Sequence, residues 1–334
     1  MKNVVIYAIL ILCSLLSFSS CTNDLADEQF QKMVLLTDNG LVDYDIDYTD
    51  EGTVLLNLPV SINGTSKNSQ DVTASLALAS DTLSKYNFER YRNRTALYYQ
   101  LADENMYSFP NGPSVTIKAG EDYAIVPLQL NLNNFDFYKN YILPIKVASS
   151  SSYPVASSKY STLLMRLNIS NFFSGTYSVS GNVWEDSNSG QKLSISSASL
   201  YALSSNTCYL YTGSVTESDE DRSGYTLTVS VDKNIFTDSE EASTGAQIRK
   251  YTKLTIGSKD TDKKVTDLSN NGSYVSVSKL EDTVNKNLEN VITKIYLKYS
   301  YMNLRDASYP VKMVFEGTFT KSVSIDKRTG KPQK

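Results

Sequence analysis

The sequence predicts an all-β protein with two domains, an N-terminal Ig-like β-sandwich and a C-terminal antiparallel β-domain that is either barrel-like or a sandwich. Apolar and polar residues alternate over many short segments, the spacing that places every second side chain on one face of a strand. The 334 residues include 24 tyrosines and many serines, threonines and asparagines. Tyrosine, threonine and valine favour strands, whereas serine and asparagine favour turns.

Four alternating rows define the predicted N-terminal sandwich, which we assign to residues 31–169. Turn signals such as Asn63-Gly64 and Ala119-Gly120 separate the rows, as expected for a sandwich of Ig-like type. Residues 81–106 are less regular and allow either a short helix or a long crossing loop. The apolar members of the rows are Val54, Leu56, Leu58, Val60 and Ile62; Val72, Ala74, Leu76 and Leu78; Ala124, Val126, Leu128, Leu130 and Leu132; and Leu163, Met165, Leu167 and Ile169.

A domain boundary is expected at Asn168–Phe172, where the strand pattern stops and a new set of rows begins. We assign residues 171–325 to the second domain. The polar residues 326–334 are expected to form a frayed tail. The apolar rows of this domain are Tyr225, Leu227, Val229 and Val231; Ile295, Leu297, Tyr299 and Tyr301; and Val311, Met313, Phe315 and Phe319.

Residues 1–21 have the pattern of a bacterial lipoprotein signal. Lys2 is followed by an apolar run over Val4–Phe18, and two serines precede Cys21. The run is too short to span a bilayer comfortably and ends in small residues, which is typical of a cleaved targeting segment. Cleavage before Cys21 would leave this cysteine to be lipidated; a plain secretory signal is the alternative. Residues 22–30 would then be a flexible tether, and the mature protein would be anchored to a membrane.

Composition excludes several classes of function. The chain has no histidine, which removes Ser–His–Asp and Cys–His nucleophiles and histidine metal ligands. A net charge of −4 offers no basic surface for nucleic acid. Cys13 would leave with the signal and Cys21 would carry lipid, so Cys208 could form no intramolecular disulfide. We expect no cofactor, no metal and no catalytic residues.

Acidic residues at 43–51 are the first candidate for a site. An EF-hand loop beginning at Asp43 would need glycine at its sixth position, which is Tyr48. Alternation puts Asp43, Asp45 and Asp47 on one strand face, so a solvated face is the preferred interpretation, with an oxygen-ligand Ca²⁺ site as the alternative. A glycosidase needs two carboxylates at a defined separation, and sequence alone cannot place such a pair.

Trp184 is the main candidate for ligand binding. Tyr177, Val179 and Val183 form the apolar face of its strand, which places the indole on the opposite face. Glu185, Asp186 and Asn188 follow it and could hydrogen-bond the hydroxyls of a ligand. A tryptophan that packs against a neighbouring loop is the alternative.

Tyr209 and Tyr211 form the second candidate. If Cys208 and Leu210 point inward, the two tyrosines point outward together and present a paired aromatic surface, unless they only pack across strands. Cys208 would then be a buried, unreactive thiol. Tyr296, with Lys294 and Lys298 beside it in the alternation, is a third, weaker outward group.

Several segments resemble a known family. Val115–Glu121, followed by Tyr141–Val147, is similar to the core of an Ig-like N-terminal domain of unknown function found in surface lipoproteins of Bacteroidetes. The stretch that starts at Phe172–Tyr177 resembles the β-domain that often follows it, and the acidic residues after Cys21 resemble an export signal of such lipoproteins. The resemblance implies a place among polysaccharide-utilisation genes and a location on the outer membrane, facing the cell exterior. It carries over no catalytic motif.

The sequence therefore leads to one expected function and two alternatives. We expect a non-catalytic cell-surface lipoprotein that binds a polysaccharide or oligosaccharide and takes part in its capture, with a transporter complex as a further candidate partner. The first alternative is an adhesin or scaffold that contacts a partner protein at the outer membrane, which a contiguous exposed apolar patch would indicate. The second is an unrecognised hydrolase.

Overall fold

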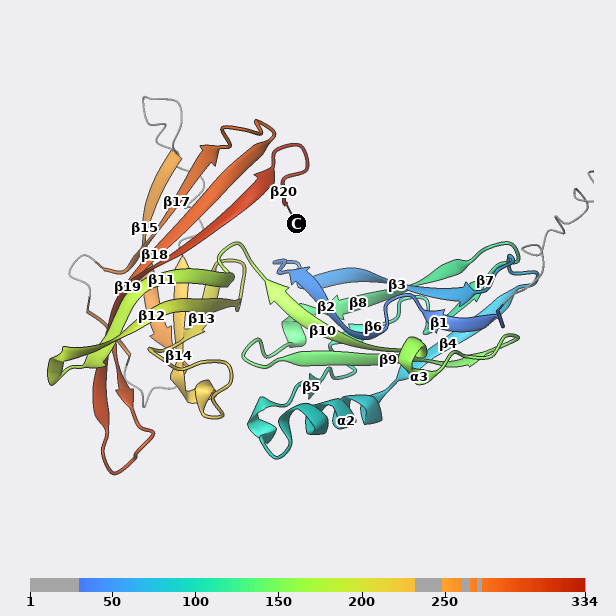
Figure 1. The fold of residues 1–334 in the computed structure, drawn as a ribbon, viewed down its shortest axis with the longest axis horizontal. Helices are drawn as coiled ribbons and strands as arrows, with labels where there is room; N and C mark the ends of the chain where they lie inside the picture. Colours follow the sequence, from blue (N-terminus) through green and yellow to red (C-terminus); the bar gives the residue numbers. More distant parts are fainter. Residues whose placement is uncertain (1–29, 232–247, 260–264, 269–271, 334) are drawn as a thin grey trace, which may run out of the picture.

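The computed structural model describes residues 30–231, 248–259, 265–268 and 272–333. It confirms an all-β fold in two domains (Figure 1). The predicted lipoprotein signal, Cys21 and most of the tether lie outside the described residues.

The N-terminal domain is a sandwich of two sheets. The first sheet has the strand order β1-β3-β8-β6, and the second has the order β2-β10-β9-β4-β7, with β5 added beside β9. The bounds in the first sheet are Met33–Leu36 for β1, Thr53–Asn63 for β3, Tyr123–Asn131 for β8 and Tyr107–Ser108 for β6. Those in the second are Gly40–Asp47 for β2, Thr162–Ser170 for β10, Tyr141–Ser150 for β9, Val72–Leu78 for β4, Ser114–Ile117 for β7 and Gln100–Leu101 for β5.

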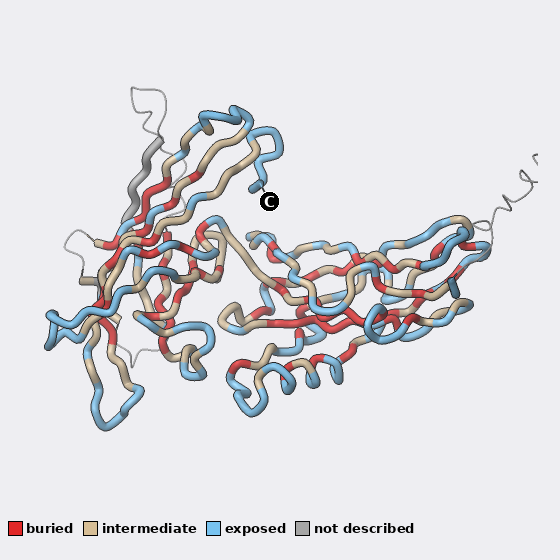
Figure 2. Tube along the Cα trace, viewed as in Figure 1, coloured by how far each residue is buried: buried red, intermediate tan, exposed pale blue. Residues whose placement is uncertain are grey.

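The four predicted apolar rows face the core between these two sheets. Figure 2 shows that buried residues recur along the strands of this domain. Leu58 and Val60 of β3 pack with Val126 and Leu128 of β8, and each is exposed by 1% or less. Strand β2 pairs in parallel with β10, from Leu163↔Gly40 to Ser170↔Asp47. The other long pairings of the second sheet are antiparallel.

The irregular segment 81–106 contains a helix, the first of the two structures that the sequence allowed. Helix α2 (Ser80–Tyr91) buries Leu83 and Asn87, four residues apart on one face, and Leu83 packs on Ile142 and Leu164. Asn87 donates to the carbonyl of Tyr99 at 2.9 Å and accepts its N–H at 3.0 Å. The short helix α3 spans Ser158–Ser161, and single turns of 3₁₀ helix span Thr95–Leu97 (η1), Leu132–Asn134 (η2) and Arg222–Tyr225 (η3).

The C-terminal domain is a closed ring of antiparallel strands. Each strand from β11 to β15 pairs with the next; β15 then pairs with β17, β17 with β18, β18 with β19, and β19 with β11. Of the two forms that the sequence allowed, this ring is the barrel-like one. The bounds are Gly175–Glu185 for β11, Asn188–Ala202 for β12, Thr207–Tyr211 for β13, Thr226–Val231 for β14, Ile248–Ser258 for β15, Thr266–Asp267 for β16, Tyr274–Glu281 for β17, Leu288–Asn303 for β18, Val311–Asp326 for β19 and Lys331–Pro332 for β20.

Large aromatic rings fill the interior of this ring of strands. Tyr177, Tyr299, Phe315 and Phe319 are each exposed by 2% or less. The hydroxyl of Tyr177 donates to the carbonyl of Phe173 at 2.8 Å, and the hydroxyl of Tyr299 accepts the N–H of Gly213 at 3.0 Å. The hydroxyls of Tyr177 and Tyr299 therefore have partners, as burial requires.

Two glycines allow β11 and β19 to approach closely. Gly181 lies opposite Gly317 in the register of these strands. A Cβ atom on Gly317 would lie 2.6 Å from the Cα of Gly181 and 2.9 Å from the ring of Phe315, which covers both glycines. Only glycine fits at either position without displacing the backbone or the ring.

The linker between the domains is held by one asparagine. Strand β10 ends at Ser170, beyond Asn168 where the sequence places the start of the boundary. The side chain of Asn171 accepts the N–H groups of Phe173 and Ser174 at 2.9 and 2.7 Å. It also donates to the carbonyls of Ser204 and Thr207 at 2.6 and 3.1 Å. The linker is therefore fixed to the C-terminal domain.

The expectation of a frayed tail is wrong for most of residues 326–334. Strand β20 pairs with β19 through Ile325↔Pro332 and Asp326↔Lys331. The carboxylate of Asp326 accepts the backbone N–H of Arg328 at 2.9 Å and pairs with its guanidinium at 2.6 Å. Gly330, at φ 67°, completes the turn that reverses the chain.

Candidate functional site

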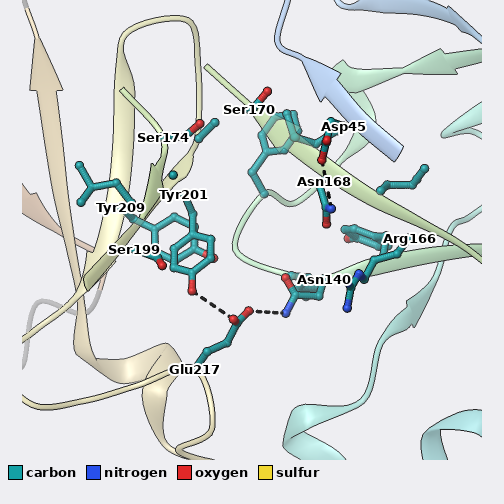
Figure 3. Close-up of a pocket in the computed structure, with 18 of the residues that line it drawn as sticks. Asp45, Asn140, Arg166, Asn168, Ser170, Ser174, Ser199, Tyr201, Tyr209 and Glu217 are labelled. Carbon is teal, nitrogen blue, oxygen red and sulfur yellow. Dashed lines mark hydrogen bonds between the residues drawn. The ribbon is translucent and has the colours of Figure 1, made fainter. Parts of the chain in front are cut away.

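A cavity with a volume of about 530 Å³ lies between the two domains (Figure 3). Strands β2, β9 and β10 and the loop before β9 provide its wall in the N-terminal domain. The start of β11, the ends of β12 and β13 and the loop after β13 provide the wall in the C-terminal domain. The cavity therefore needs both domains and the linker that joins them.

Stacked tyrosines form the C-terminal wall. The rings of Tyr201 and Tyr209 lie 4.9 Å apart and 22° from parallel, and Tyr211 meets Tyr209 edge-on at 5.8 Å. Tyr138 of the other domain lies 5.0 Å from Tyr209, so this wall is also part of the contact between the domains. Tyr201 and Tyr209 line the cavity.

The prediction of an exposed tyrosine pair is wrong for Tyr209. Cys208 and Leu210 are buried inside the ring of strands, so the predicted strand phase is confirmed. Tyr209 does lie on the other face, but that face is covered by Tyr201 and Tyr138, and only 2% of the residue is exposed. Tyr211 is half-buried. Burial raises the pKa of Tyr209 well above its ordinary value, so its hydroxyl stays protonated.

Glu217 connects the two walls (Figure 3). Its carboxylate accepts the hydroxyl of Tyr201 at 3.1 Å and the side-chain amide of Asn140 at 3.1 Å. Nearby, the guanidinium of Arg94 pairs with Glu220 at 3.0 Å. These contacts join the loop after β13 to the N-terminal domain at the edge of the cavity.

A ladder of paired polar side chains forms part of the N-terminal wall. Because β2 and β10 run in parallel, Asp43, Asp45 and Asp47 lie opposite Arg166, Asn168 and Ser170. The Arg166 guanidinium binds the Asp43 carboxylate and lowers its pKa, and Ser170 donates to Asp47 at 3.1 Å. Arg166 also donates to the hydroxyl of Tyr99 at 3.1 Å.

The three aspartates of this ladder are exposed, which confirms the predicted solvated face. Across the described residues, no three His, Cys, Asp or Glu side chains are grouped so as to hold a metal ion. The partners of these carboxylates are instead the polar side chains of β10.

Trp184 lies on the outer face of β11, as predicted, and is half-buried. The ammonium of Lys192 lies 4.4 Å from the centre of its ring. Glu185, Asp186 and Asn188 are exposed, and Asp186 pairs with Lys312 at 2.9 Å. Glu185 and Asp186 also line a smaller hollow of about 320 Å³ beside Tyr309.

The predicted ligand residues therefore lie in two separate places. The β11–β12 hairpin that carries Trp184 is at the end of the ring away from the N-terminal domain (Figure 1), whereas Tyr209 lies in the contact between the domains. No residue of the group around Trp184 lines the cavity.

Cys208 is buried and free, as predicted. Burial raises the pKa of its thiol to about 12, and its sulfur donates to the side-chain oxygen of Asn171 at 3.2 Å. A thiol with that pKa is almost entirely protonated at neutral pH and is a poor nucleophile.

Sequence reasoning missed most of the residues that enclose the cavity; of the predicted ligand residues, Tyr209 alone lines it. Asn140, Tyr201 and Glu217 lie in three distant segments, and no local pattern marks them as neighbours. The alternation of Arg166, Asn168 and Ser170 in β10 was a usable signal, since three polar residues alternate there with the apolar row.

No helix among the described residues has the length and apolar character needed to cross a membrane. This finding concerns only the part of the chain that the structure describes.

Comparisons with known proteins identify two domain families and one fold. Residues 25–151 match a "Domain of unknown function (DUF4973)", and residues 161–320 match a family described as "-like, C-terminal". No curated protein matches the sequence.

Three solved structures share the fold over almost their whole length. Two are Bacteroides ovatus proteins of unknown function, with TM-scores of 0.74 and 0.73 and identities of 22% and 23%; the alignments cover 90% and 89% of this chain and 97% and 93% of theirs. The third, an auxiliary nutrient binding protein from Bacteroides thetaiotaomicron, has a TM-score of 0.70 at 21% identity over 86% of this chain and 92% of its own. Residues 25–151 thus match the DUF4973 family, and residues 161–320 match a second, C-terminal family. The two domains together have the fold of these Bacteroides proteins.

Proposed function

We propose that this protein is a non-catalytic saccharide-binding protein and that a small saccharide occupies the cavity between its domains. The observation that carries the proposal is the lining of the cavity, where aromatic rings stand opposite a ladder of hydrogen-bonding side chains. A volume of about 530 Å³ lies within the usual range for small-molecule sites. A sugar can contact both walls. Its C–H face packs on an aromatic ring, and its hydroxyls accept and donate hydrogen bonds.

The charges around the cavity favour an uncharged ligand. Its ionisable lining consists of Asp45 and Glu217 on the acidic side and Lys139 and Arg166 on the basic side, with several tyrosines. Arg166 is already engaged by Asp43 and Tyr99, and Lys139 lies 3.4 Å from Asp136. Both bases are therefore already paired, and the described lining of the cavity offers no free cation to an anionic ligand.

The shared fold supports a role in nutrient capture. One protein of this fold is described as an auxiliary nutrient binding protein, and its source is a Bacteroides species. Together with the sequence pattern before Cys21, this supports capture at the outer membrane, facing the cell exterior, with a transporter complex as a candidate partner.

Substitution of Tyr201 tests the proposed site. We expect Tyr201→Ala to weaken saccharide binding by about 1–2 kcal/mol, roughly five- to thirtyfold in Kd, because the sugar would lose an aromatic surface. The soluble chain from residue 23 would first be screened on a glycan array, and the best neutral glycan would then be titrated by calorimetry.

Three further variants make this experiment decisive. Tyr123→Ala removes a tyrosine that is 56% exposed on β8, outside the cavity, and should leave the affinity unchanged. Asn168→Ala removes a polar group of the opposite wall and should also weaken binding. Tyr201→Phe keeps the ring and checks that folding is intact. Unaltered affinity in both Tyr201→Ala and Asn168→Ala would contradict a site in this cavity.

The proposed membrane anchor has its own test. We expect Cys21→Ala to leave the protein unprocessed or to release it from the membrane fraction, because position 21 would have no thiol to carry lipid. Immunoblots of cell fractions, with Cys13→Ala as the matched control, measure this. A Cys21→Ala protein that is processed and retained in the membrane like the unaltered one would contradict lipid anchoring.

A further inference from the structure

A second surface with aromatic rings lies on the outer face of the C-terminal ring of strands. Its residues come from β11, β12, β17, β18 and β19, which lie side by side in the sheet. We call this surface the outer platform. Its aromatic and charged members are Trp184, Lys192, Tyr274, Lys294, Tyr296, Lys298 and Glu316.

The rings stand at the two ends of the outer platform. Trp184 lies beneath Lys192 at one end. At the other end, Tyr296 of β18 stacks on Tyr274 of β17, with ring centres 5.3 Å apart and planes 25° apart; Tyr274 is 39% exposed.

The register of the strands gives the distance between these ends. Tyr296 is level with Ser180 of β11, two strands away, because both pair with Thr318 of β19. Trp184 lies four residues further along β11. With strands about 4.8 Å apart and a rise of about 3.3 Å per residue, Trp184 and Tyr296 are roughly 16 Å apart. A short oligosaccharide can span that distance, whereas a single pyranose ring cannot.

Polar side chains held by hydrogen bonds occupy the middle of the outer platform. Glu316 accepts the hydroxyl of Tyr296 at 2.9 Å and pairs with Lys298 at 3.0 Å, and its pKa is lowered chiefly by Lys298. Asn182 is level with Glu316 in the register and accepts from Ser194 at 3.1 Å. The middle of the surface is therefore ordered before any ligand arrives.

The charge of the outer platform differs in sign from that of the chain. The outer platform carries three lysines and one glutamate. Lys298 is paired with Glu316, so the ammonium groups of Lys192 and Lys294 give the surface its net positive charge. The whole chain carries a net charge of −4. A local excess of positive charge beside partly exposed rings is complementary to a saccharide that carries carboxylates.

We propose that the outer platform binds an extended anionic saccharide chain, such as one built of uronate residues. Trp184 and the Tyr274–Tyr296 pair stack on sugar rings at its two ends, and Lys192 and Lys294 bind its carboxylates. This proposal rests on saccharide capture as the function of the protein, but it concerns a site separate from the cavity. The two sites would take ligands of different charge.

Fluorescence titration of the soluble protein with a defined oligogalacturonate tests the outer platform, because Trp184 is the only tryptophan. We expect the emission to shift on titration. The affinity should fall about tenfold in Trp184→Ala, measured by calorimetry, through loss of the stacking surface. Lys294→Gln should weaken binding several-fold and flatten its dependence on salt, since a screened ion contact is lost. An uncharged cello-oligosaccharide of the same length is the comparison ligand.

The control variant is Lys159→Gln, which removes a lysine 5.0 Å above the ring of Tyr160 in the other domain and should leave the affinity unchanged. Tyr201→Ala should also leave oligogalacturonate binding intact. Trp184→Phe keeps a stacking ring and is the control for misfolding. Retained affinity in Trp184→Phe would show that the loss in Trp184→Ala comes from the missing ring. If the oligogalacturonate does not bind while a neutral glycan still binds in the cavity, the outer platform is overturned and the proposed function stands. If no saccharide binds at all, both proposals fail.

Discussion

Replacement of Asn171 by alanine is expected to lower the free energy of unfolding of the C-terminal domain by about 3 kcal/mol. The side chain satisfies two backbone N–H groups and two backbone carbonyls, which join the linker to the turn before β13. Alanine would remove all four of these hydrogen bonds from a half-buried setting beside Cys208, although the Thr207 carbonyl would keep the N–H of Leu203 at 2.8 Å and the Ser174 N–H would keep the Asn171 carbonyl at 3.2 Å. Urea denaturation followed by circular dichroism measures the loss.

Two comparisons make this result specific to the hydrogen bonds of Asn171. Asn188→Ala removes an exposed asparagine of the same domain and should change the stability by less than about 0.5 kcal/mol. Asn171→Asp keeps the accepting oxygen but sets a second oxygen against the carbonyls of Ser204 and Thr207, so it should not restore the stability that Asn171→Ala loses. Equal stability of Asn171→Ala and the unaltered protein would show that the linker does not depend on this side chain.

Substitution of Gly317 by alanine should destabilise the same domain by about 2–3 kcal/mol, through overpacking rather than loss of contacts. The added Cβ would meet the backbone of β11 at Gly181 and the ring of Phe315, both well inside normal contact distance. The strands would have to separate at a point where Phe315 and Tyr299 stack with ring centres 5.1 Å apart. Thermal unfolding measures the effect.

Gly190→Ala is the matched control, because a Cβ there meets nothing closer than 3.6 Å. Phe315→Leu, combined with Gly317→Ala, separates the two causes of strain. The shorter side chain relieves the clash with the ring but not the clash with the Gly181 backbone, so it should not restore stability. A Gly317→Ala protein as stable as Gly190→Ala would show that β11 and β19 can adjust without cost.

The apolar rows could be predicted because the two-residue period of a strand is a local property. Leu163, Met165 and Leu167 are buried as their alternation predicts, and so are Ile295 and Leu297. Trp184 faces outward for the same reason. The two-residue period determines which face of the strand each of these side chains occupies, and it can be recognised from the sequence alone.

What covers a face depends on distant segments, and here the sequence was insufficient. Tyr209 has the predicted phase but is buried, because Tyr201 of the next strand and Tyr138 of the other domain pack against it. The cavity could not be predicted either, since Asn140 and Glu217 meet only after both domains have folded and docked. The frayed tail was expected from polarity alone, whereas pairing of the last residues with β19 is a tertiary contact.

The pairing of an early strand with a late strand in each domain has a consequence for how the chain acquires its structure. In the first domain, β2 pairs with β10, so residues 123 positions apart must meet, as in Leu163↔Gly40. In the second, β11 is closed by β19, as in Ser178↔Thr320. Contacts this distant in sequence make folding slow, because a long loop must close before they form. Neither domain can complete its sheet until its final strand has emerged, so each half of the newly made chain must pass through an interval with an unpaired strand edge open to misassembly.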